Sequence, residues 1–114
     1  MLTMMNSDSS DDLSITQQML TPYIHIDGMP DCAWGAGWGL QIASSQPAFW
    51  HWGDNDIFTS IAVANSASRN GIVIMANGAR GFEIFRSIII KALGGNYPVI
   101  EGLESIYEIE AIGL

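Results

Sequence analysis

Three apolar segments of strand length lie between residues 48 and 76, separated by short polar turns. The first, 48–52, is rich in aromatic residues and ends in a turn at 53–56, and the second spans 58–64. Aromatic and β-branched residues favour strands, whereas glycine, asparagine and aspartate end them. The third, 71–76, is continuously apolar, as is typical of a strand buried on both faces. This order predicts consecutive strands of an antiparallel sheet.

The flanking segments complete the expected fold. Residues 34–43 have the pattern of a glycine-punctuated strand that forms a hairpin with 48–53. After residue 81, apolar residues recur at helical spacing as far as Gly94 and Gly95, which predicts a helix. Residues 97–114 are consistent with a short helix or a strand. We therefore expect an α+β fold, with an antiparallel sheet of three to four strands and a C-terminal helix packed on one face.

Composition narrows the functional classes. The 114 residues carry twelve acidic and four basic side chains, a net charge of −8, and 48% of the residues are hydrophobic. The length predicts a single domain over 1–114, with 1–12 flexible; that this domain is a partial one is what the family resemblance described below implies. The negative charge argues against binding of nucleic acid or of anionic membranes. With no signal peptide, no apolar run of spanning length and one cysteine, the chain is expected to be soluble and, by default, cytoplasmic.

His51 is the first candidate for chemistry. In a strand, side chains alternate between the two faces, so Phe49 and His51 share one face while Trp50 and Trp52 share the other. The imidazole then lies at a strand end, beside backbone amides released by the turn. The alternative for a histidine in this setting is a purely structural one that satisfies its hydrogen bonds.

The tryptophans, the cysteine and the second histidine give weaker indications of a functional site. The four tryptophans (Trp34, Trp38, Trp50, Trp52) are expected in the core rather than in a carbohydrate-binding platform. A reactive pair of Cys32 with His51 is not favoured, because an isolated cysteine is usually inert. His25, Asp27 and Asp31 lack a recognised metal-ligand spacing, so we predict no metal and no cofactor.

The arrangement of these segments resembles the C-terminal part of the serine β-lactamase-related hydrolases. That family includes class C β-lactamases, penicillin-binding proteins and related esterases. The similarity covers roughly residues 13–95 and is carried by a helix at 13–22, the glycine-tryptophan strand, the aromatic strand ending at 51–55, an apolar strand, Asn77-Gly78 and an apolar helix.

The resemblance implies roles for the end of the aromatic strand. His51-Trp52-Gly53 matches a Lys-Thr-Gly or His-x-Gly triplet that lines the family's active site. By this resemblance His51 influences protonation and substrate placement, the backbone amide of Asp54 belongs to the oxyanion hole, and Trp52, Gly53 and Asn55 contact substrate. Ile57 stands where the family commonly has glycine.

Two further family motifs are absent from the chain. The nucleophile of the family lies in Ser-x-x-Lys, but Lys91, the single lysine, has Ile88 three residues before it. Tyr-x-Asn or Tyr-x-Ser is also missing, because the residues two positions after the three tyrosines are His25, Val99 and Ile109. In the family both motifs lie upstream of the region matched here.

The sequence thus predicts a C-terminal fragment of a β-lactamase-related serine hydrolase. Such enzymes hydrolyse an ester, amide or β-lactam through an acyl-enzyme, and this chain alone is expected to be inactive because it lacks the nucleophile. It would meet a small-molecule acyl substrate only when completed by the missing N-terminal part. The alternative is a non-enzymatic interaction or oligomerisation module, a homo-oligomer formed through an exposed sheet edge.

Overall fold

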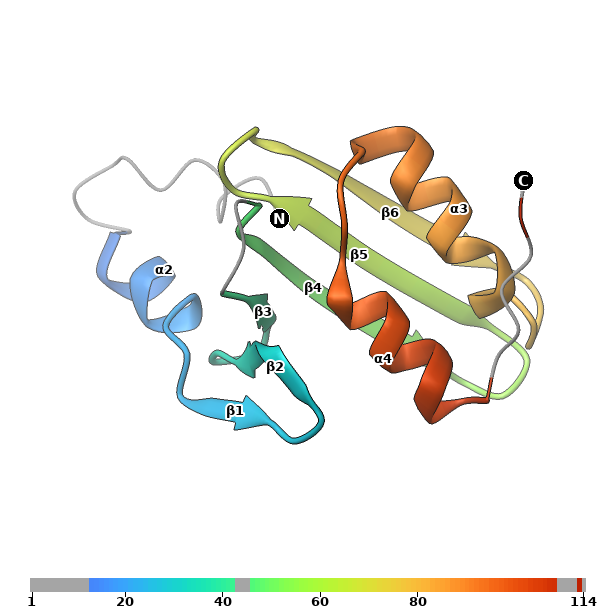
Figure 1. The fold of residues 1–114 in the computed structure, drawn as a ribbon, viewed down its shortest axis with the longest axis horizontal. Coiled ribbons are helices and arrows are strands. Elements are labelled where there is room, and N and C mark those ends of the chain that lie inside the picture. The colour runs from blue at the N-terminus through green and yellow to red at the C-terminus, as the bar shows by residue number, and fades with distance from the viewer. Residues whose placement is uncertain (1–12, 43–45, 109–112, 114) are drawn as a thin grey trace.

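A computed structural model describes residues 13–42, 46–108 and 113. In these residues, six antiparallel strands form one sheet in the order in which they occur in the chain (Figure 1). They are β1 (Ile24–Ile26), β2 (Met29–Trp34), β3 (Gly39–Gln41), β4 (Ala48–Asp54), β5 (Thr59–Asn65) and β6 (Asn70–Ala76). The expected flexible segment 1–12 lies outside the described residues.

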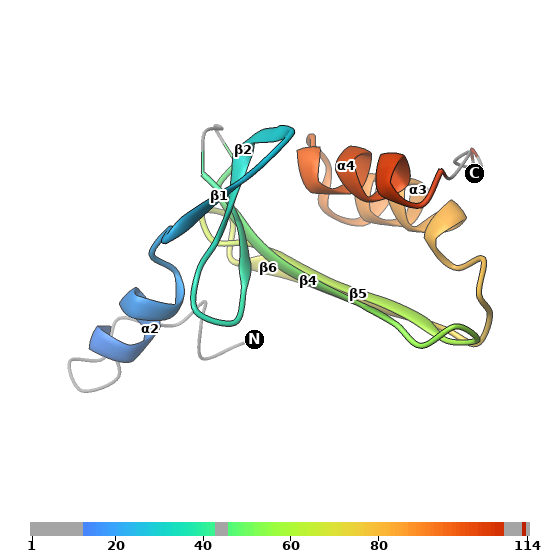
Figure 2. The same ribbon diagram turned by 90° about the horizontal axis from the view of Figure 1, so that it is seen from below.

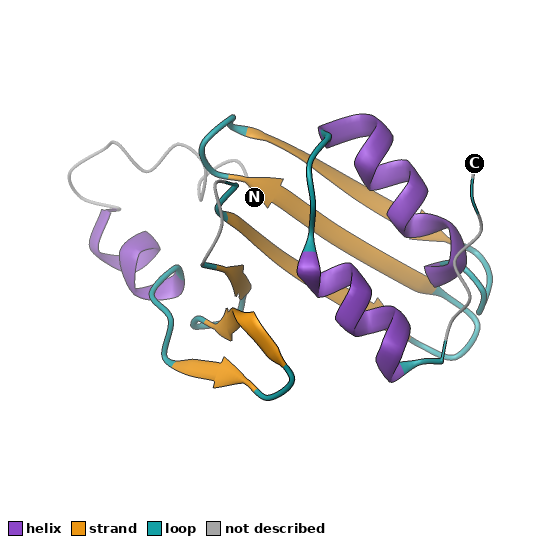
Figure 3. Ribbon diagram, viewed as in Figure 1, coloured by secondary structure: helices purple, strands orange, loops and turns teal. Residues whose placement is uncertain are grey.

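Helices lie on both sides of this sheet, but they cover it unequally. Helices α3 (Phe82–Leu93) and α4 (Pro98–Ile106) lie side by side on one face, and α2 (Leu13–Met19) lies on the other side, next to the β1–β3 end (Figure 2). Helix α3 packs on β5 and β6 and α4 packs on β2, and Figure 3 shows both in front of the same face of the sheet. The helices therefore cover part of one face of the long strands.

The main core lies between the sheet and these two helices. Its largest side chain, Trp50 of β4, is fully buried. Strands β2, β4 and β5 and the two helices supply buried residues of this core, and partly buried residues of β1 and β6 pack against them. The buried residues include Cys32, Ala48, Ile61, Val63, Phe85, Ile89, Val99 and Leu103. The aromatic strand thus contributes its even-numbered residues to the core, as its alternation predicts.

A charged pair joins the two helices at the edge of this core. Arg86 of α3 donates from Nε to Oε1 of Glu104 in α4 at 2.9 Å, and its Nη2 donates to Oε2 of the same carboxylate. Glu104 is largely buried, so the two parallel hydrogen bonds satisfy a carboxylate that is removed from water. The pair fixes the position of α4 along α3.

The sheet has six strands where the sequence predicted three to four. Residues 34–43 do not form one strand: Trp34 pairs with Gly39, and the chain turns between them with Gly37 at φ +88°. Glycine adopts that backbone conformation without steric cost, so the same glycines that suggested an irregular strand form a turn. The β1–β2 hairpin turns at Gly28 and was missed because β1 is too short to give a periodic signal.

In the second half of the chain, the structure confirms one prediction, resolves one that was left open and contradicts a third. The helix predicted after residue 81 is confirmed as α3, and it ends at Gly94, whose φ is +69°. The segment left open between helix and strand contains α4, which begins at Pro98. The prediction that 71–76 is buried on both faces is wrong, because β6 is an edge strand with helices on one side only. Val73 and Met75 on its other side are 58% and 83% exposed.

Gly39 offers a test of this packing. A Cβ atom at residue 39 would lie 2.3 Å from Cζ2 of Trp50, so the indole occupies the space that any side chain would need. We expect Gly39→Ala to lower the free energy of unfolding by about 1–3 kcal/mol, measured by urea denaturation, because the buried ring must move. The control is Gly78→Ala, where the added Cβ has no neighbour within 4 Å. Equal stability of the two variants would contradict the placement of Trp50.

Candidate functional site

The face of β4 to β6 opposite α3 and α4 is open where β4 ends. Trp50 and Trp52 pack toward the helices, so alternation directs His51 and Gly53 to the opposite side. Helix α2 contributes to a small cluster on that side, formed by Leu40, Phe49 and Ala64 with Met19, Leu20 and Trp38. Beyond Phe49, the described residues leave this side of the sheet uncovered. We call it the open face.

The register of the strands defines which residues share the open face with His51. His51 lies opposite Ala62 of β5, which lies opposite Val73 of β6. Two residues further along β4, Gly53 lies opposite Ser60 of β5, and Ser60 lies opposite Met75 of β6. The residues of the open face are therefore His51, Gly53, Ser60, Ala62, Val73 and Met75. The central strand contributes only small side chains, so a ligand can approach the backbone there.

An open hollow of about 450 Å³ lies at the end of these three strands. Its wall combines apolar residues with polar residues of the strand ends and turns. The two large apolar residues that line it are Phe58, which is half-exposed, and Met75, which is exposed. The lining residues are Gly53, Asp54, Asn55, Phe58, Thr59, Ser60, Met75, Ala76 and Asn77. Such a mixture suits a small ligand with an apolar group and a few polar atoms.

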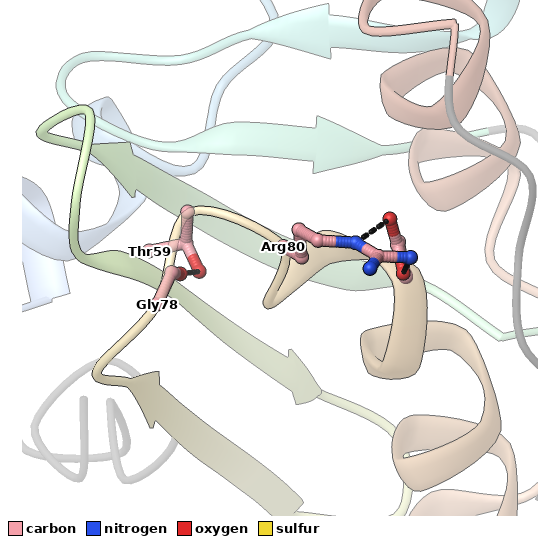
Figure 4. Close-up of polar contacts among 4 residues, drawn as sticks. Thr59, Gly78 and Arg80 are labelled. Atoms are coloured by element: carbon pink, nitrogen blue, oxygen red, sulfur yellow. Dashed lines mark hydrogen bonds and ion pairs between the residues drawn. The ribbon is translucent and has the colours of Figure 1, made fainter.

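The loop after β6 is anchored beside this hollow. The hydroxyl of Thr59 donates to the carbonyl oxygen of Gly78 at 3.0 Å, and Arg80 makes two bonds to Glu83 at 2.7 and 2.8 Å (Figure 4). A Cβ at Gly81 would lie 2.0 Å from the Thr59 hydroxyl, so only glycine allows this close approach. The wall formed by Asn77 is thereby held against β5.

The direction of the backbone groups of β4 follows from hydrogen bonds at its two ends. Asn55 donates its N–H to the carbonyl of Phe58 at 3.0 Å, and Ser66 donates its N–H to the carbonyl of Pro47, also at 3.0 Å. Both bonds join the β4 side to the β5 side. Backbone groups of a strand alternate in direction, so the odd-numbered residues of β4 face β5 and the even-numbered residues face away from it.

This alternation leaves a free backbone edge at the end of β4. Strand β3 begins at Gly39, which pairs with Trp50 of the antiparallel strand β4. No strand among the described residues therefore lies on that side of β4 after Trp50. The N–H of Asp54 and the carbonyl of Trp52 therefore face this edge. Asp54 is also one of the residues that line the hollow. An acceptor atom of a ligand can reach that N–H from the edge.

His51 is exposed and its ring is oriented by the neighbouring residue. Its Nδ1 lies 2.8 Å from the carbonyl oxygen of Trp52, and its ring centroid lies 6.2 Å from that of Trp34. A carbonyl oxygen only accepts hydrogen bonds, so Nδ1 carries the proton and Nε2 of the neutral ring is the acceptor. His51 can thus accept a proton or a hydrogen bond at Nε2.

The structure brings most, but not all, of the predicted site residues together. Gly53, Asp54 and Asn55 line the hollow, and His51 lies one row away on the same face without lining it. Trp52 lies on the opposite face, stacked on Trp50 with ring centroids 5.0 Å apart. Alternation places Trp52 there, so its side chain does not face a ligand in the hollow.

Several lining residues were not singled out by the sequence. Phe58, Ser60 and Met75 are not among the residues that the sequence predicts for the site, and Asn77 enters there only as part of the family resemblance. Their position depends on the register that sets Gly53 opposite Ser60 and Ser60 opposite Met75. Counting alternate residues outward from the two hairpin turns is the signal that would have found them.

The alternative readings of the aromatic and cysteine residues are resolved by burial. Trp34, Trp50 and Trp52 pack together with centroid distances of 5.0 to 6.2 Å, and Trp38 packs edge-on against Phe49 at 5.0 Å. Trp50 is fully buried, and the other three tryptophans are partly buried against the two apolar clusters, so all four contribute to packing. Cys32 is fully buried on the helix side of the sheet, so it cannot pair with His51 on the open face.

Metal-binding side chains do not gather in the described part of the chain. No group of three or more histidine, cysteine, aspartate or glutamate residues comes together there in a way that would hold an ion. His25 lies on the edge strand β1, with its side chain exposed. Nothing in its position adds a ligand role to it.

The buried Cys32 thiol gives a prediction with a pH dependence. Burial, with a smaller contribution from the charge of Asp31, raises the pKa of Cys32 from 9.0 to about 11. The thiol of the folded protein stays protonated at pH 8, so iodoacetamide should label it only after unfolding. Unfolding then releases a proton above pH 9, and the free energy of unfolding should fall between pH 9 and 11.

Replacement of the cysteine separates this effect from other alkaline groups. Cys32→Ala should flatten part of the fall in stability between pH 9 and 11, measured by urea denaturation across that range. Burial also raises the pKa of Tyr97, but Tyr97 contributes equally to both proteins. Rapid labelling of the folded protein at pH 8 would contradict the burial of Cys32.

Comparisons with known proteins add no relative to this picture. No family model, no curated protein and no solved structure matches the chain. The resemblance to the serine β-lactamase-related hydrolases therefore rests on the residues and strand order described above. In the described ranges, none of the helices has the length and apolar character needed to cross a membrane.

Proposed function

We propose that this chain forms one wall of an acyl-transfer site of the β-lactamase-related serine hydrolase type. The observation that carries the proposal is the free edge of β4, where the N–H of Asp54 faces outward, together with the hollow that Asp54 also lines. A β-lactamase-like arrangement of the sheet and α3 belongs to the same proposal. The substrate class is an ester, an amide or a β-lactam.

In this proposal, each feature of the wall contacts one part of the substrate. The carbonyl oxygen of the substrate accepts a hydrogen bond from the N–H of Asp54, and the negative charge that develops on this oxygen strengthens that bond. The apolar acyl group rests against Phe58 and Met75 in the hollow. Nε2 of His51 lies on the same face and serves as a hydrogen-bond partner for a polar group of the substrate.

The nucleophile is not supplied by this wall. Acyl transfer requires a serine hydroxyl whose oxygen bonds to the acyl carbon while its proton passes to a base and the leaving group departs. Ser-x-x-Lys, which fills that role in the family, does not occur in this sequence. The chain therefore binds the acyl compound weakly and does not react with it unless another polypeptide segment provides the serine.

Binding to the wall can be followed by nuclear magnetic resonance. We expect benzylpenicillin to shift the backbone amide signals of Gly53, Asp54 and Asn55, with a dissociation constant on the order of millimolar because only one side of the ligand is covered. Phe58→Ala should weaken this binding severalfold by removing apolar surface from the hollow. The matched control is Ile24→Ala, which removes an exposed apolar side chain from β1, at the other edge of the sheet.

Covalent labelling tests the second half of the proposal. The purified chain should remain unlabelled by a fluorescent penicillin and by a fluorophosphonate, and it should not hydrolyse a chromogenic ester. Covalent labelling would contradict the absence of a nucleophile. Absence of shifts at residues 53–55, or equal shifts in Phe58→Ala, would contradict the binding wall itself.

A further inference from the structure

We propose that β6 pairs with β6 of a second copy of this chain, antiparallel and about a two-fold axis that passes beside Val73. The pairing joins two six-stranded sheets into one continuous sheet. This contact uses the edge strand β6, whereas the proposed acyl-transfer site uses the free edge of β4. The proposed dimer therefore does not rest on the acyl-transfer function. Four properties of β6 carry the inference.

The first property is the direction of its backbone groups. Ser66 donates to Pro47, so even-numbered residues on the β5 side face β4 and odd-numbered residues of β5 face β6. Val63 and Ile61 are paired with Ile72 and Ile74, which therefore bond to β5. The N–H and carbonyl groups of the alternate residues Gly71, Val73 and Met75 then face outward. No strand among the described residues lies on that side of β6.

The second property is that nothing blunts this edge. Natural edge strands are usually protected by charged residues, proline, a bulge or short length. Strand β6 has seven residues, Asn-Gly-Ile-Val-Ile-Met-Ala, without charge or proline, and its register with β5 runs without a shift. Val73 and Met75 expose 58% and 83% of their surface. Such an edge is a template for another strand.

The third property is that the strand is complementary to itself. With Val73 opposite Val73 of the copy, Ile72 lies opposite Ile74 on the helix side of the sheet. On the open face, Met75 lies opposite Gly71, whose missing side chain leaves room for the long methionine. A two-fold contact needs one patch that fits itself in this way. Gly71, Val73 and Met75 of each copy supply all of the backbone donors and acceptors for the hydrogen bonds between the two β6 strands.

The fourth property is the local charge. A chain of net charge −8 repels its own copies in most orientations. Residues 57–82, which include β5, β6 and their turns, contain no acidic side chain, and their two charged residues are Arg69 and Arg80. The twelve acidic residues thus lie elsewhere in the sequence, so β5, β6 and their turn add no carboxylate to this edge.

Light scattering after size-exclusion chromatography tests the proposal. The full chain should elute with twice the monomer mass of 12.4 kDa. Val73→Pro removes an outward N–H and leaves the bonds to β5 intact, as proline on an edge strand allows, so this variant should elute as a monomer. Val73→Ala keeps the N–H and should remain a dimer. Circular dichroism of both variants checks that the sheet has formed.

Cysteine cross-linking tests the register independently. Val73→Cys should form a disulfide dimer under mild oxidation, because residue 73 faces itself across the axis at a distance a disulfide can span. Met75→Cys is more exposed, yet it should cross-link more slowly, because it faces Gly71. Cys32 is buried and does not compete. A wild-type monomer at all concentrations, a dimer that survives Val73→Pro, or faster cross-linking through residue 75 would each overturn the proposal.

Discussion

The burial of Trp50 is the interaction on which the rest of the structure depends. Its indole is fully enclosed, with ring centroids 5.1 Å from Trp34 and 5.0 Å from Trp52, and it occupies the space left by Gly39. The packing fixes which face of β4 lies under α3 and α4. A shift of one residue in register would expose Trp50 and bury His51, at the cost of several kcal/mol for the largest core side chain.

The orientation of Trp50 has direct consequences for the candidate site. With the even-numbered side chains of β4 in the core, His51 and Gly53 are directed to the open face by alternation alone. The even-numbered backbone groups face the other way in the plane of the sheet, toward β3. Because β3 begins opposite Trp50, the N–H of Asp54 reaches a free edge. One buried ring thus sets both the side-chain and the backbone geometry of the proposed wall.

Local pattern predicted the strands from Ala48 to Ala76 and helix α3 with little error, because turns, alternation and helical spacing are each encoded within a few residues. It did not separate a turn from a strand at Gly35 to Trp38, where small residues and tryptophans suit both. It also could not show that β6 is an edge strand, since exposure depends on what lies beside it. The hollow near Phe58 depends on register across three strands, which no single segment encodes.

Helices α3 and α4 pack on one face of the sheet, and the described residues leave the opposite face of β4 to β6 open beyond Phe49 (Figure 2). Paramagnetic broadening of methyl signals by a soluble gadolinium chelate measures this directly. We expect strong broadening for the methyls of Met75 and Ala62 and little for those of Ile61 and Val63, which are at most 1% exposed. Equal protection of Met75 and Ile61, or broadening of Val63, would contradict this arrangement.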